Sequence, residues 1–101
     1  MTTQERQEIK EWGRTVVRLR REGSFVDLLH AEIKVSDLTI KEIAAACRTS
    51  SASVNKWKCK NPDQHVYPAA HYLYRLAKCL HPVDYWDHYK LYTIKINAER
   101  D

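Results

Sequence analysis

Glycine and proline are scarce in this chain, with two and three residues respectively among 101. An all-β fold needs many tight turns, and collagen or a flexible linker needs far more of both residue types, so these classes are excluded. Apolar residues make up 44% of the sequence, well above the level of a disordered chain. The composition therefore predicts a small, mostly helical protein, with residues 1–101 in one domain that is too small for a large, pocketed enzyme.

Long apolar runs are also missing, and the first residues are rich in Gln, Glu and Arg. A membrane-spanning helix needs about 20 consecutive apolar residues and a secretory signal needs an apolar core, so we expect neither, and no membrane partner. The cysteine count is odd, the three cysteines lie far apart, and no Cys-x-x-Cys pair is present. We therefore expect reduced thiols in a cytoplasmic protein.

Ligand-binding and catalytic patterns are sparse. Cys79-x-His81 is the only close Cys/His pair, and the paired spacing that is typical of zinc sites is absent. The cysteines and histidines that could act as distant partners are Cys47, Cys59, His65, His71 and His88. No Ser/His/Asp constellation, phosphate loop or carboxylate pair has convincing spacing. The sequence therefore predicts a protein that is not an enzyme and has no metal, cofactor or small-molecule ligand.

Acidic residues are absent between Glu42 and Asp63, although the rest of the chain mixes both signs of charge. The basic residues in this window are Arg48, Lys56, Lys58 and Lys60, and they equal the whole net charge of +4. Each phosphate that a basic residue neutralises releases counterions, so a local basic segment without acids is typical of a polyanion-binding face. A chance cluster of four charges is the alternative.

Helix-start signals and apolar spacing predict the helices. Thr2 with Glu5, and Thr39 with Glu42, form capping boxes, while Ser24 starts a helix that Ser36-Asp37 ends. The expected helices are 3–21, one from Ser24 to Ser36, one from Thr39 to about Cys47, 51–59, one opened by Pro68 that ends at His81-Pro82, and 83 to about 90. Inward-facing residues are expected to be Ile9, Trp12, Val16, Leu19, Phe25, Leu28, Leu29, Ile33, Ile43, Leu73, Leu76, Ala77 and Leu80.

The segment 91–97 fits two structures. The spacing of Tyr85, Tyr89 and Tyr92 with Ile96 suits a helix, whereas the β-branched residues of the segment favour a strand. The aromatic density suits a protein interface, and a strand here could pair with its copy across a two-fold axis. We expect the dimer interface in the segment 83–101, at Tyr89, Tyr92, Ile94 and Ile96.

The segment 38–59 has the design of a helix-turn-helix. Two short helices joined by a three- or four-residue turn cross steeply, and the crossing needs a small residue on the first helix. Ala44 supplies that residue, and Val54 and Trp57 supply apolar partners one turn apart on the second helix. The outer face of this second helix coincides with the acid-free basic window.

At this point the sequence resembles the lambda-repressor-like (Cro/repressor type) helix-turn-helix family. The matching residues are Leu38-Thr39-x-x-Glu42-Ile43-Ala44, Ser50-x-x-x-Val54-x-x-Trp57 and Leu73-x-x-Leu76-Ala77-x-x-Leu80. The resemblance covers about residues 25–87 and places Trp86 in the core. It implies an all-α, compact domain of five to six helices, usually dimeric, whose second motif helix enters the major groove of double-stranded DNA. The short C-terminal β-strand at the dimer interface is the alternative that the residues of 91–97 leave open beside this fold.

The resemblance also implies roles for single residues. Base-reading positions fall on Ser51, Ala52 and Lys56, and the chemistry of Asn55 suits adenine. Phosphate contacts are expected at Thr39, Arg48, Thr49, Ser50, Lys58 and Lys60. Arg48 stands where the family has a turn glycine, so we expect it to adopt a positive φ at a cost of about 1 kcal/mol. Ile40 replaces a residue that is often polar.

The expected function is a phage-like transcription regulator, most simply a homodimeric repressor that reads the major groove with the helix 51–59. The same fold suits a DNA-binding factor in recombination, packaging or replication initiation. It also suits a protein-interaction module, such as an inhibitor or antitoxin, that does not read DNA. The additional N-terminal helix, residues 1–22, either packs on the domain as a sixth helix or forms a dimer surface.

Overall fold

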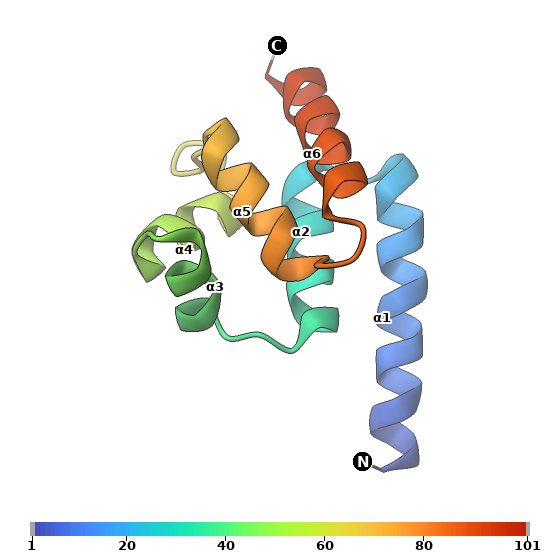
Figure 1. Cartoon of the computed structure of the whole chain (residues 1–101). Helices are drawn as coiled ribbons and strands as arrows, with labels where there is room; N and C mark the ends of the chain where they lie inside the picture. The colour runs from blue at the N-terminus through green and yellow to red at the C-terminus, as the bar shows by residue number, and fades with distance from the viewer. Residues whose placement is uncertain (1, 101) are drawn as a thin grey trace.

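The computed structural model describes residues 2–100, which form six α-helices and no strand in that range (Figure 1). The helices are α1 (Thr3–Glu22), α2 (Phe25–Ser36), α3 (Ile40–Cys47), α4 (Ser51–Lys58), α5 (Ala70–Leu80) and α6 (Tyr85–Glu99). The all-α prediction is therefore confirmed. Of the two structures considered for 91–97, the helix is correct and the strand is wrong. No helix among residues 2–100 is both long enough and apolar enough to cross a bilayer.

Side-chain caps start four of the helices where the sequence predicted them. Both capping boxes form, with the Glu5 and Glu42 amides donating to the hydroxyls of Thr2 and Thr39 over 3.2 and 3.1 Å. The Ser24 hydroxyl caps α2 and the Ser50 hydroxyl caps α4. The fifth helix begins at Ala70 rather than at the buried Pro68, so that prediction was early by two residues.

The core lies between α2 and the helices that surround it. α2 packs against α1, α4, α5 and α6, while α3 packs against α4 and α5. The buried residues of the core are Val16, Phe25, Leu28, Leu29, Ala31, Ile33, Ile43, Ala44, Cys47, Val54, Trp57, Leu73, Leu76, Ala77, Leu80, Tyr92 and Ile96. The predicted inward faces of α2 to α5 are thus confirmed, including Ala44 at the crossing of α3 and α4.

The helix α6 corrects three predictions. Tyr92 and Ile96 are 0% and 4% exposed, so they belong to the core and cannot form a dimer interface. They lie one turn apart on α6, and this face packs against α2 and α5. Trp86 was expected in the core but is 52% exposed, since it projects from the first turn of α6 with its ring stacked on Tyr89.

The helix α1 packs on the domain as a sixth helix. It lies along α2, and Figure 1 shows that its N-terminal half runs past the rest of the fold. Val16 is buried and Trp12 and Leu19 are partly buried, whereas Ile9 is 47% exposed, contrary to the prediction. The amphipathic stripe therefore continues beyond the surface that covers it.

Candidate nucleic-acid interface

The turn between α3 and α4 sets the crossing of the two helices. Arg48 adopts the left-handed conformation, with φ 57° and ψ 47°, which confirms the expected positive φ. The amide of Arg48 donates to Ala45 O over 3.2 Å, and the amide of Thr49 donates to Ala44 O over 3.0 Å. The turn therefore satisfies the last carbonyl groups of α3 with its own amides.

The orientation of α4 separates a core face from an outer face. Val54 is 0% and Trp57 is 3% exposed, and the centroid of the indole ring lies 5.3 Å from that of the Tyr72 ring on α5. The four expected base-reading residues, Ser51, Ala52, Asn55 and Lys56, are all exposed. Because α4 buries its apolar stripe, these four side chains share the solvent side of one short helix.

Two histidines hold the C-terminal end of α4. His30 on α2 has its Nε2 atom 2.6 Å from the carbonyl oxygen of Lys58, and His65 has its Nε2 atom 3.0 Å from the carbonyl oxygen of Trp57. A carbonyl group only accepts, so each imidazole carries its proton on Nε2. Sequence reasoning missed both residues, because nothing in the spacing of His30 and His65 relates them to α4.

The expected phosphate contacts lie at the start of α3, which Thr39 caps, and around the two ends of α4. Thr39, Arg48, Ser50 and Lys60 are exposed, and Thr49 and Lys58 are half-buried. The Thr39 hydroxyl already donates to Glu42 Oε1 over 3.0 Å, and the Ser50 hydroxyl accepts the Ser53 amide over 3.2 Å. These two hydroxyls therefore fix helix starts, and the lysines and Arg48 supply the charge.

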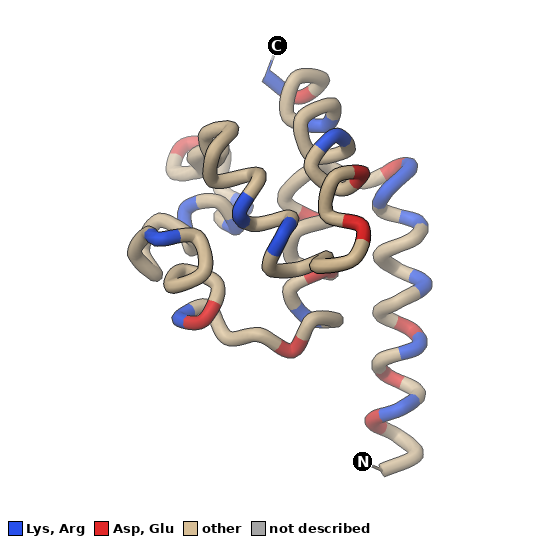
Figure 2. Tube along the Cα trace, in the orientation of Figure 1, with Lys and Arg blue, Asp and Glu red and all other residues tan. Residues whose placement is uncertain are grey.

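The surface charge of this region has one sign. Figure 2 shows no acidic residue along the turn or α4, in agreement with the sequence between Glu42 and Asp63. The carboxylate of Glu42, at the first turn of α3, is held by the capping box. A polyanion that approached α4 would meet cations without an adjacent free carboxylate.

A groove continues this basic surface past the turn. It has a volume of about 640 Å³ and is lined by Arg48, Arg75 and Lys78 together with the rings of Tyr74 and Trp86. Arg75 also donates from Nη1 to the Cys47 carbonyl oxygen over 3.3 Å, at the end of α3. The sequence analysis did not relate Arg75 or Lys78 to the motif, because they lie on α5, well outside it.

The cysteines are free thiols, as expected. A hydrogen bond with the Cys79 thiol and burial raise the pKa of Cys47, which is therefore a protonated, apolar-like core residue. The Cys79 thiol of the Cys79-x-His81 pair is therefore engaged by Cys47.

Comparison of the chain with family models, with curated proteins and with solved structures finds no match. The resemblance to lambda-repressor-like domains is therefore carried by the motif residues alone.

Proposed function

We propose that the protein is a sequence-specific, double-stranded DNA-binding transcription regulator of the lambda-repressor-like type, acting as a homodimeric repressor. The observation that supports this most is the orientation of α4. Val54 and Trp57 are buried, while Asn55 and Lys56 point to solvent within the acid-free segment. The major groove of B-DNA admits an α-helix, and an outer face of small and basic residues allows close approach.

Base reading is assigned to the outer face of α4. Lys56 donates to guanine O6 or N7, the Asn55 amide pairs with the edge of adenine, and the methyl group of Ala52 contacts that of thymine. The Ser51 hydroxyl donates to an acceptor or accepts from a donor on the base edge, so it discriminates little. Because this set contains a single long donor, part of the specificity comes from the shape and deformability of the DNA.

Phosphate binding is assigned to the cations that flank α4. Arg48 lies at the turn, Lys58 is the last residue of α4, and Lys60 follows the helix. Each phosphate contact adds affinity that does not depend on sequence and that weakens with salt.

A homodimer gives the specificity that one small module lacks, since two modules read half-sites one helical turn apart. Of the four interface residues predicted from the sequence, Tyr89 is half-buried and Ile94 is 66% exposed. Trp86 and Val83, which are 52% and 96% exposed, extend the apolar surface at the start of α6. An Ile94→Glu variant that stays dimeric in light scattering would remove Ile94 from the interface.

The experiment that tests DNA binding selects duplexes from a random pool at physiological salt and measures their affinity by fluorescence anisotropy. Lys56→Ala should weaken binding to the selected duplex by about 1–3 kcal/mol and relax the preference at one base pair. Lys10→Ala on α1 is the matched control, because Lys10 is also exposed and lies outside the motif. Failure to select any duplex, or equal losses for the two variants, would exclude the proposed face.

A protein-interaction module, such as an inhibitor or antitoxin, is the second candidate, and the exposed Trp86, Val83 and Ile94 favour it. The salt dependence of binding distinguishes the two functions. DNA binding should weaken steeply as salt rises, whereas an apolar protein interface should hold.

A further inference from the structure

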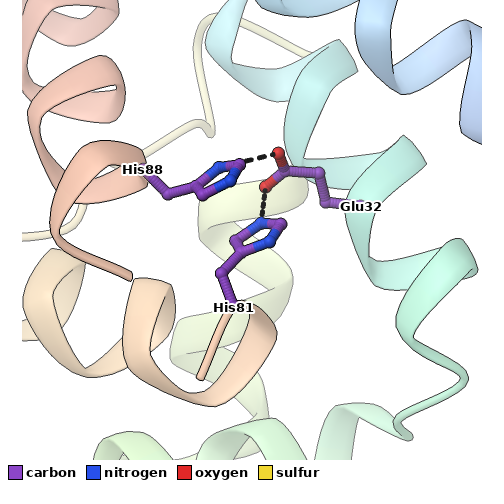
Figure 3. Close-up of side chains that lie close together, drawn as sticks. All are labelled: Glu32, His81 and His88. Carbon is purple, nitrogen blue, oxygen red and sulfur yellow. Dashed lines mark ion pairs between the residues drawn. The ribbon is translucent and has the colours of Figure 1, made fainter. Parts of the chain in front are cut away.

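A buried polar cluster lies on the side of the fold away from α4. It consists of Glu32 on α2, His81 at the end of α5 and His88 on α6 (Figure 3). Glu32 is 2% and His88 is 4% exposed, and the possible ligand atoms of the three residues all lie within 4.8 Å of one another. Buried charges of this kind are costly unless they are paired or coordinate a metal ion.

The hydrogen bonds of His88 leave one ring nitrogen without a partner. Its Nε2 atom lies 3.1 Å from Asp84 Oδ2 and 3.2 Å from Arg20 Nη2, so it donates to the carboxylate in one tautomer and accepts from the guanidinium in the other. In the tautomer with the proton on Nε2, the imidazole donates to Asp84. The Nδ1 atom then carries a lone pair and lies 3.6 Å from Glu32 Oε1. Both Nδ1 and Oε1 are buried without a hydrogen-bond partner. In this tautomer two lone pairs face each other in the core, and a metal cation between them would turn their repulsion into two attractive contacts.

The distances suit a metal ion. Bonds of about 2.0–2.2 Å in a tetrahedral site separate two ligand atoms by about 3.3–3.5 Å. The Nδ1 atom of His88 and Glu32 Oε1 are 3.6 Å apart, close to that separation.

His81 completes a three-residue donor set. Its Nε2 atom lies 2.9 Å from Glu32 Oε2, and its ring stacks on the His88 ring with centroids 3.4 Å apart. The Tyr92 hydroxyl donates to the same Glu32 oxygen, which fixes the carboxylate. Because a metal lies in the plane of each imidazole that binds it, the two stacked rings must splay when an ion enters.

The cluster is accessible from one side. A cavity of about 240 Å³ beside α1 is lined by Glu32 and His81, and also by Arg20. The Arg20 guanidinium lies 3.8 Å from Glu32 Oε1 and 3.2 Å from His88 Nε2. Its side chain is 36% exposed, so it can move into solvent when another cation takes its place.

We propose that Glu32, His81 and His88 bind a divalent transition-metal ion of the zinc class, with Asp84 orienting His88 and Arg20 serving as the counter-ion of the metal-free form. Two histidines and one carboxylate are a zinc donor set with a fourth position open. A carboxylate on the outer nitrogen of a ligating histidine is the usual second partner of such sites. The ion joins α2 to α5 and α6, and the site is independent of the DNA-binding proposal.

The test treats the full chain with a chelator and titrates it with Zn²⁺ by calorimetry and with Co²⁺ by visible absorption. We expect one ion per chain, Co²⁺ bands of a four-coordinate site without thiolate charge transfer, and a higher melting temperature with Zn²⁺. His81→Asn should weaken binding at least tenfold, since it removes a ligand at a half-buried position. His71→Asn is the matched control because His71 is exposed and lies outside the cluster.

Two further variants keep the outcome decisive if Glu32→Gln fails to fold. Asp84→Asn should weaken binding about tenfold, as loss of a second partner does in other sites. Arg20→Ala should tighten binding, because it removes the competing cation, whereas a purely structural ion-pair network gives lower stability and no gain in affinity. Absence of stoichiometric binding, binding with thiolate bands, or equal affinity of His81→Asn and His71→Asn would overturn the proposal.

Discussion

The Nε2 atom of His30 lies 2.6 Å from the carbonyl oxygen of Lys58, so a side chain of the central helix α2 is bound to the last residue of α4. α4 has only eight residues, a length at which an isolated helix is not stable in water. Its position therefore depends on tertiary contacts, namely Val54 and Trp57 in the core and the histidines at its C-terminal end. The core of the protein and the proposed DNA-reading face are coupled through this contact.

His30→Ala should destabilise the protein by about 1–3 kcal/mol, because it leaves the Lys58 carbonyl group without its donor. The end of α4 should fray, and the affinity for the selected duplex should fall although His30 does not contact DNA. Urea denaturation measures the loss of stability, and amide hydrogen exchange in α4 measures the fraying. The exposed His71→Ala serves as the control and should change neither; unchanged exchange in the His30 variant would show that the contact does not hold α4.

Arg48 combines a strained backbone with a proposed phosphate contact, and two substitutions separate these roles. Arg48→Gly should stabilise the protein by about 0.5–1 kcal/mol, since glycine adopts the left-handed conformation without the cost of a Cβ atom. Arg48→Ala keeps the strain and should bring no such gain. Both variants remove the charge, so both should reduce the salt slope of DNA binding by about 1. Denaturation and salt titrations of both proteins measure these effects, and an unchanged slope would remove Arg48 from the contacts.

Tyr92→Phe should destabilise the protein by about 1–3 kcal/mol, because the buried Glu32 carboxylate loses the donor that Tyr92 supplies. Packing changes little, since the ring remains beside Phe25 with the same shape. Tyr89→Phe removes a hydroxyl from a half-buried position of the same helix and should be close to neutral. Equal stabilities of the two variants in chemical denaturation would contradict this role of Glu32.

The helices up to α5 could be predicted because their signals are local. The capping residues Thr2, Thr39 and Ser50 lie within three residues of the amides that they bind, and apolar residues recur at helical spacing. The exposed face of α4 followed in the same way, since burial of Val54 and Trp57 fixes where their neighbours point.

The structure of the C-terminal segment could not be predicted because it depends on distant partners. Thr93, Ile94 and Ile96 are β-branched, which favoured a strand as much as a helix. Contacts with the junction of α1 and α2 favour the helix: Lys95 Nζ donates to the carbonyl oxygen of Gly23, the C-cap of α1, over 2.6 Å, and the amide of Phe25, the first residue of α2, donates to Glu99 Oε1 over 2.6 Å. The same limit applies to Glu32, which meets its histidine partners only after the chain has folded.

Stability of the metal-free protein should fall when the pH drops from about 7.5 to about 5.5, the range in which histidines titrate. The groups that face His88 are Glu32, His81, Arg20 and Asp84, and burial together with the His81 charge lowers the pKa of His88 below its ordinary value of 6.5. The unfolded chain therefore binds this proton first, so the contribution of neutral His88 to stability is present above its ordinary pKa of 6.5, begins to fall as the pH approaches that value, and is lost toward the lower pKa of the folded chain.

The pH dependence can be assigned to His88 by substitution. Burial raises the pKa of Asp84, but the charges of His88 and His81 and the hydrogen bonds from His88 and the backbone together lower it below its ordinary value of 3.8. Asp84 therefore stays ionised throughout this range. Urea denaturation in the presence of a chelator should give a flatter slope of unfolding free energy against pH for His88→Gln than for the wild type. The slope is compared rather than the stability itself, because the substitution also disturbs the core. Parallel slopes would mean that the pKa of His88 is the same in the folded and unfolded chains, and that its burial beside Glu32 costs the charged imidazole nothing.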